Sequence, residues 1–196
     1  VQPAKGCVDG KMAIKLAPRR ITVDEYHKMA AVGILAEDEH TELIDGEILQ
    51  MSPIGGRHVE VVRKLNHLLV RAVGDDWGVN VQSPIALPPY GEPEPDFALV
   101  QSRSYRGEIP RPADVLLVME VSDTSLSYDQ ETKLPMYAEQ AIPEAWIIDI
   151  TGRIIKRHSE PVNGIYTSTK TAGPGMAIES AVLPSFKLVL DDILDL

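Results

Sequence analysis

Two carboxylates and one amine have the types and spacing of a hydrolytic metal site. Asp96 follows Pro95 and opens the apolar run FALV, while Glu120 follows the apolar run VLLVM. Lys133 comes thirteen residues after Glu120, in a segment with helical character. Carboxylate oxygens suit Mg²⁺ or Mn²⁺, and such an ion polarises a phosphoryl group and lowers the pKa of an attacking water. The lysine would then orient that water or stabilise charge in the transition state.

Each of the three residues also has a purely structural interpretation. Asp96 could be a turn or cap acid, Glu120 could pair with an Arg or Lys at the sheet edge, and Lys133 could be a solvated helix residue. A carboxylate at the end of a buried strand is costly when it is unpaired. The combination of the three therefore favours a site over three separate structural roles.

The site can form only if the strands that carry the two acids are neighbours. Apolar runs between Pro- and Gly-rich turns predict strands over residues 79–82, 85–87, 97–101 and 115–122. Residues 115–119 are apolar at every position, which is typical of a central strand covered on both faces. A helical segment at 127–140 and a buried strand at 146–150 complete a βαβ unit. The expected fold class is α/β, with a mixed central sheet flanked by helices.

Other segments give clear local signals. Thr22-Val-Asp-Glu25 has the spacing of a capping box and predicts a helix to about Ala31. Asp45-Gly46 between two apolar runs predicts an N-terminal hairpin over 41–52. A second helix is expected over 56–73, and its apolar stripe comprises Val59, Val62, Leu65, Leu69 and Ala72. Residues 153–158 and 165–170, around Asn163-Gly164, predict a C-terminal β-meander.

Pro135 leaves two positions open for Lys133. If Pro135 lies in the first turn of a helix that starts near Leu134, Lys133 sits at the mouth of that helix. If the helix runs on with a kink, Lys133 and Tyr137 share a face. Tyr137 could then hold the lysine or a phosphate oxygen, and its alternative role is a packing aromatic with a solvated hydroxyl.

Length and charge restrict the class of protein. The 196 residues predict a loosely ordered arm over 1–18 and a single domain over 19–196. Residues 1–20 carry a net charge of +4, whereas the rest of the chain, with 14 basic and 28 acidic residues, carries −14. Such an acidic body repels polyanions, which weighs against binding nucleic acid by bulk charge but not against an enzyme that uses cations.

Composition also bears on location and on other metals. One cysteine excludes an intramolecular disulfide and favours a reducing, cytoplasmic compartment. No apolar run approaches the length of a membrane span, so no membrane partner is expected. The five histidines lack ligand spacing, which argues against a zinc site.

Several motifs together resemble one known family. They are Glu94-Pro-Asp96, Glu120-Val-Ser122-Asp123 and the run from Lys133 to Asp149, preceded by Glu42-Leu-Ile-Asp-Gly-Glu47, Met51-Ser-Pro and His58. In this combination they look like the Uma2 family, formerly the domain of unknown function DUF820, which is abundant in cyanobacteria. The resemblance covers about residues 20–195, nearly the whole chain.

The resemblance implies a restriction-endonuclease-like core of the PD-(D/E)xK superfamily. It implies Asp96 and Glu120 as metal-binding acids, the carbonyl of Val121 as a backbone ligand, and Glu42 as an additional acid from the N-terminal part. Mg²⁺ or Mn²⁺ is the implied cofactor.

The superfamily pattern of acid, any residue, lysine is broken in this chain. Ser122 stands where the lysine is usual, and Lys133 matches a lysine that substitutes for it from the following helix. His58, Ser122 and Tyr137 are expected at the rim of the site.

Two hypotheses about function follow. The first is a Mg²⁺-dependent endonuclease that hydrolyses DNA, which could work as a homodimer or a higher homo-oligomer. The second is a catalytically weak or inactive nuclease fold that serves as a nucleic-acid or protein binding or regulatory module. The serine at 122 and the net charge of −10 motivate the second hypothesis.

Overall fold

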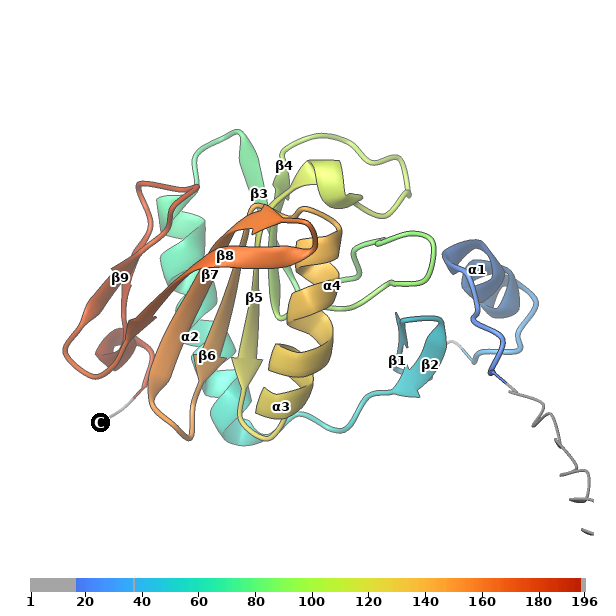
Figure 1. Cartoon of the computed structure of the whole chain (residues 1–196), viewed down its shortest axis with the longest axis horizontal. Coiled ribbons are helices and arrows are strands. Elements are labelled where there is room, and N and C mark those ends of the chain that lie inside the picture. Colours follow the sequence, from blue (N-terminus) through green and yellow to red (C-terminus); the bar gives the residue numbers. More distant parts are fainter. Residues whose placement is uncertain (1–16, 37, 195–196) are drawn as a thin grey trace, which may run out of the picture.

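A six-stranded mixed sheet forms the centre of the computed structural model, which describes residues 17–36 and 38–194 (Figure 1). Neighbouring strands pair antiparallel except β5 and β6, which are parallel and joined by a helical crossover. In spatial order the strands are β3 (Trp77–Val81), β4 (Phe97–Gln101), β5 (Val115–Ser122), β6 (Glu144–Asp149), β7 (Ile154–Val162) and β8 (Ile165–Ala172). The predicted mixed α/β architecture is confirmed.

Each face of the sheet is covered by a helix (Figure 1). On one face α2 (Gly56–Ala72) packs its buried Leu65 and Leu69 against Leu117 and Met119 of β5. On the other face α4 (Leu134–Glu139) belongs to a second apolar cluster, which includes Val118. Successive residues of a strand point to opposite faces, so residues 115–119 of β5 are all apolar because both faces of the strand are covered.

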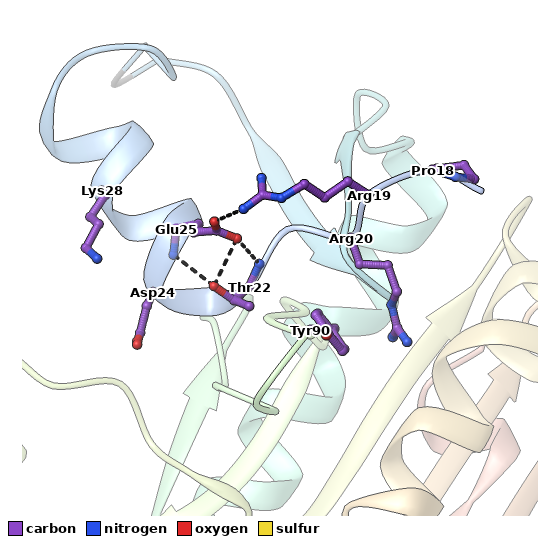
Figure 2. A pocket seen from close by; sticks show the side chains of 8 residues that line it. All are labelled: Pro18, Arg19, Arg20, Thr22, Asp24, Glu25, Lys28 and Tyr90. Atoms are coloured by element: carbon purple, nitrogen blue, oxygen red, sulfur yellow. Dashed lines mark hydrogen bonds and ion pairs between the residues drawn. The ribbon is translucent and has the colours of Figure 1, made fainter. Parts of the chain in front are cut away.

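The N-terminal elements confirm two local signals. Helix α1 (Val23–Ala31) begins with a capping box in which Thr22 and Glu25 exchange hydrogen bonds (Figure 2). Strands β1 (Thr41–Ile44) and β2 (Glu47–Gln50) form the expected hairpin. Its turn residues Asp45 and Gly46 have φ of 52° and 83°, the left-handed conformations that a two-residue hairpin turn requires.

Towards the C-terminus the meander around Asn163-Gly164 is present, with β7 and β8 inside the central sheet. A small separate pair, β9 (Ala177–Glu179) and β10 (Lys187–Val189), follows it and was not expected from the sequence. Short 3₁₀ turns occupy residues Pro112–Asp114 and Leu190–Asp192.

Two expectations about local structure were wrong. Residues 85–87 form no strand, because only Leu87 makes an isolated bridge, to Gly91. They are apolar because all three are buried, not because they pair with a strand. In α2, Val59 is 52% exposed and the buried stripe uses Val61 instead.

The helical segment that carries Lys133 resolves the two alternatives for Pro135. It runs continuously through α3 (Leu126–Tyr128), a π-helical turn (Asp129–Lys133) and α4. Pro135 does lie in the first turn of α4, but Lys133 is inside the helical path and not at its mouth. Proline lacks an N–H and crowds the preceding turn, and the wide turn, in which the N–H of Leu134 bonds the carbonyl of Asp129, accommodates it.

Of the arm expected over residues 1–18, only 17 and 18 fall within the described residues. No helix in the described part of the chain is long and apolar enough to cross a membrane.

Candidate active site

The ends of β4 and β5 bring Asp96 and Glu120 together. Phe97 pairs with Met119, so Asp96 stands one position beyond the ladder, beside Glu120. Because β4 has ended, the N–H of Val121 has no strand partner there and donates to Oδ2 of Asp96 at 2.8 Å. The N–H and C=O of one strand residue point to the same edge. The carbonyl of Val121 therefore also faces the side of Asp96.

Two further side chains hold Asp96. His58, in the first turn of α2, lies 3.0 Å from Oδ2 through its Nε2, and the amide of Gln82 donates to Oδ1 at 3.2 Å. Burial favours the neutral form of His58, but the hydrogen bond and charge of Asp96 outweigh it and raise the histidine pKa. The structure thus brings His58 to the site, and it adds Gln82, which the sequence analysis missed.

Lys133 is buried between two glutamates. Its Nζ donates to Oε1 of Glu42 at 2.8 Å and lies 3.4 Å from Oε1 of Glu120. Burial alone would lower the lysine pKa, but the charges of Glu120 and Glu42 outweigh it and raise the pKa above its usual value. The amine is therefore a charged ammonium, and the alternative of a solvated helix lysine is wrong.

Glu42 comes from the N-terminal hairpin, 91 residues before Lys133. Its Oε1 also accepts a hydrogen bond from the backbone N–H of Glu94 at 2.7 Å. The extra acid implied by the family resemblance thus lies at the site, where its observed contact is with the lysine.

Glu120 is the most perturbed acid of the group. The hydroxyl of Tyr137 donates to its Oε1 at 2.5 Å. Burial raises the pKa of Glu120 to about 8, with Asp129 and Asp96 adding repulsion and Lys133 opposing the rise. Tyr137 is fully buried, so the alternative of a solvated hydroxyl is wrong, and its partner is the glutamate rather than the lysine.

Asp129 is a fourth buried acid, which the sequence analysis did not identify. The hydroxyls of Ser122 and Ser125 donate to its Oδ2 at 2.7 and 2.6 Å. Burial raises the pKa of Asp129, although both hydroxyls oppose the rise. Ser122 therefore does not replace the usual lysine but positions Asp129. A serine two residues after a strand-end acid, followed by an acid on the next helix, was the available signal.

The group has more negative than positive charge. Glu42, Asp96, Glu120 and Asp129 are buried together with the ammonium of Lys133, and the partly buried His58 lies beside Asp96. No group of three or more His, Cys, Asp or Glu side chains among the described residues is arranged to hold a metal ion. Mg²⁺ commonly binds through one or two carboxylates and keeps several waters. Asp96, Glu120 and the carbonyl of Val121 are oxygen donors, the type of ligand that Mg²⁺ and Mn²⁺ take.

Comparisons with known proteins agree with this architecture. The model of the Uma2 family, described as "Putative restriction endonuclease", matches residues 23–191. The crystal structure of a putative nuclease belonging to DUF820 from Anabaena variabilis ATCC 29413 matches with a TM-score of 0.70. The match covers 88% of this chain and 97% of that chain at 16% identity, so it shows a shared fold. No curated protein matches the chain.

Proposed function

Since the chain belongs to the Uma2 family, we propose that it is a metal-dependent nuclease that hydrolyses the phosphodiester bonds of DNA. The observation that carries the proposal is the ammonium of Lys133 lying 3.4 Å from the strand-end Glu120, beside Asp96. An acid pair with a charged lysine is what in-line attack on phosphorus needs, because the reaction requires a bound cation and a donor to the developing charge.

Each residue has a distinct role in this proposal. Asp96, Glu120 and the carbonyl of Val121 would hold Mg²⁺ or Mn²⁺, which polarises the phosphoryl group and supplies an activated water when bound. Lys133 has three N–H donors. One is donated to Glu42 and the ammonium also forms an ion pair with Glu120, so a donor remains for a phosphoryl oxygen.

Glu42 and His58 act as positioning residues. Glu42 fixes the lysine through a buried contact of 2.8 Å. His58 fixes Asp96, and the hydrogen bond and charge of Asp96 raise the histidine pKa, which favours the protonated ring.

Exposure indicates the side from which DNA approaches. The side chains of Lys133 and Glu120 are each 4% exposed and Glu42 is 1% exposed. Asp96 and His58 are more open, at 12% and 14%. The substrate phosphate would therefore arrive over Asp96 and His58, with Lys133 and Glu42 at the back of the site.

Incubation of the protein with supercoiled plasmid and with single-stranded DNA, in Mg²⁺ or Mn²⁺, tests the proposal. Cleavage by the wild type and its loss in Glu120→Gln and Asp96→Asn would support it. Calorimetric titration with Mn²⁺ is the second arm, and the heat of binding should disappear in Asp96→Asn. A protein that binds neither ion and cuts neither DNA would instead be a binding or regulatory module on a nuclease fold.

A further inference from the structure

A pocket with two arginines lies beside the candidate active site and has no part in the metal chemistry. It has a volume of about 390 Å³ and is lined by Arg57, Glu60 and Arg153 together with four aliphatic residues. Arg57 comes from the first turn of α2, whereas Arg153 comes from the turn between β6 and β7. Elements far apart in sequence thus supply two guanidinium groups to one hollow.

The guanidinium groups of this pocket are open to an incoming anion. The side chain of Arg57 is 63% exposed, and its contact with Asp123 is long, at 3.4 Å. Within the described residues, Arg153 has no ion-pair partner. Exposed pairs contribute little free energy, so a phosphate could take the place of Asp123 at small cost. The start of α2, which has no side-chain cap, adds partial positive charge at the same place.

Arg57 of the pocket and its partner Asp123 each stand next to a residue of the site in the sequence. Arg57 directly precedes His58, whose ring contacts Asp96 at 3.0 Å. Asp123, the partner of Arg57, follows Ser122 at the end of β5, two residues after Val121. A DNA strand has one phosphate per roughly 3.4 Å along the helix axis. A strand that lies over Asp96 and extends along the start of α2 would present a neighbouring phosphate to Arg57.

On the basis of the proposed nuclease function, we propose that the pocket of Arg57 and Arg153 binds the DNA phosphate, with its sugar, next to the phosphate that is cut. Arginine suits this role because its planar group donates two parallel hydrogen bonds to a phosphate. The buried aliphatic side chains Val61, Ile150, Ile193 and Leu194 offer an apolar wall to the sugar. The pocket supplies locally the positive charge that a chain of net charge −10 lacks overall.

A second cationic pocket, of about 590 Å³, is the competing surface (Figure 2). Its arginines are already engaged, because Arg19 pairs with Glu25 and Arg20 pairs with Asp45. The guanidinium of Arg20 also stacks on the ring of Tyr90, 3.8 Å from its centre. These contacts make this second pocket the weaker candidate for a phosphate.

The test is the binding of a fluorescein-labelled 20-mer, single-stranded and duplex, measured by anisotropy in EDTA over a series of salt concentrations. Arg57→Ala and Arg153→Ala should each weaken binding by about threefold to tenfold. Each should also reduce the slope of log K against log salt by about 0.9 on duplex or about 0.7 on single strands. Arg71→Ala, about 21 Å away at the far end of α2, is the matched control and should change neither quantity.

Several results would overturn the inference. They are unchanged binding in the double variant Arg57→Ala/Arg153→Ala, an equal loss in Arg71→Ala, or a loss confined to Arg20→Ala. Arg57→Lys keeps the charge and should retain part of the affinity, and far-UV circular dichroism verifies that each variant is folded.

EDTA separates this inference from the proposed cleavage. Arginine-dependent binding by a protein that never cuts DNA would support the pocket and contradict the nuclease. Cleavage by a protein whose DNA binding does not depend on these arginines would support the nuclease and contradict the pocket.

Discussion

Two glutamates on neighbouring parallel strands are equally buried but differently surrounded. Glu144 of β6 accepts hydrogen bonds from the indole of Trp146 and the hydroxyl of Ser180 at Oε1, at 2.6 and 2.7 Å. Its Oε2 accepts from the N–H of Ala181 at 2.6 Å and lies 3.8 Å from Nε of Arg157. Both oxygens of Glu144 are thus supplied with donors.

Glu120 of β5 is much less completely supplied. Its contacts with Tyr137 and Lys133 are both made by Oε1, which leaves Oε2 for a ligand. Asp96 and Asp129 add repulsion, and burial raises the pKa of Glu120 to about 8.

The difference between the two glutamates separates a structural acid from a functional one. Glu144, whose two oxygens the protein supplies with donors, stabilises the fold. A buried carboxylate that lacks donors and lies among other acids is costly, which is the usual condition of groups that bind a cation or react.

The largest expected effect is on cleavage. Glu120→Gln should reduce the rate of plasmid nicking in Mg²⁺ by about 1,000-fold or more, because a bound ion supplies several kcal/mol of transition-state stabilisation. Glu144→Gln is the matched control and should keep its rate per folded molecule. Equal losses in the two variants would remove the distinction between the glutamates.

The second effect is on stability, and it should be large for Glu144 and absent for Glu120. Glu144→Gln should lower the free energy of unfolding by about 2–5 kcal/mol. The glutamine amide replaces one acceptor oxygen with an N–H group, which faces the buried donors of Trp146, Ser180 or Ala181 and leaves them without an acceptor. Glu120→Gln should not lower it, since the glutamine removes a poorly supplied acid. Urea unfolding in EDTA gives both values, and a larger loss in Glu120→Gln would contradict this interpretation.

The dependence of stability on pH sharpens the comparison. The folded pKa of Glu120 is about 8, above the unfolded value near 4.5, so folding favours its protonated form. Its contribution to stability is complete below the unfolded pKa and is lost as pH rises through about 8. In EDTA, the wild type should therefore lose stability relative to Glu120→Gln between pH 5 and 8, by up to about 1.4 kcal/mol per pH unit. Parallel curves for the two proteins over this range would show that Glu120 is already ionised in the fold.

The smallest effect concerns the tyrosine that supports Glu120. Tyr137→Phe removes one buried hydrogen bond and should lower the free energy of unfolding by about 1 kcal/mol. The pKa of Glu120 should rise further, because the hydroxyl helps to hold the ionised form. The comparison of Glu120 with Glu120→Gln is repeated in proteins that carry Tyr137→Phe. The pH at which the Glu120 protein loses stability relative to its glutamine variant should then be higher. A downward shift would be inconsistent with donation from Tyr137 to the carboxylate.

Much of the fold could be predicted from local pattern. The capping box at Thr22, the Asp45-Gly46 turn and the apolar run 115–119 of β5 depend on contacts close in sequence or on simple periodicity. The failures came where packing overrode pattern. Residues 85–87 look like a strand but are only buried, and Val59 lies on the exposed side of α2.

For the candidate site, residue types and the family motifs pointed to Asp96, Glu120, Lys133 and Glu42. They did not reveal Asp129, because a single acid on a helix looks the same whether it is solvated or buried. Gln82 was also missed. It follows β3 with a φ of 44°, and its side chain donates to Asp96, a contact that the local sequence does not indicate.

The sequence by itself determined α1, the N-terminal hairpin and most strands of the central sheet, because capping, turn conformation and apolar periodicity act over a few residues. Only the tertiary structure decided which buried acid is supplied with donors and which is not. Glu144 accepts hydrogen bonds from Ser180 and Ala181. Glu120 instead shares the ammonium of Lys133 with Glu42, which lies 91 residues before that lysine in the N-terminal hairpin. The cost of a buried charge depends on the distances to every neighbouring donor and charge, and those distances exist only once the chain has folded.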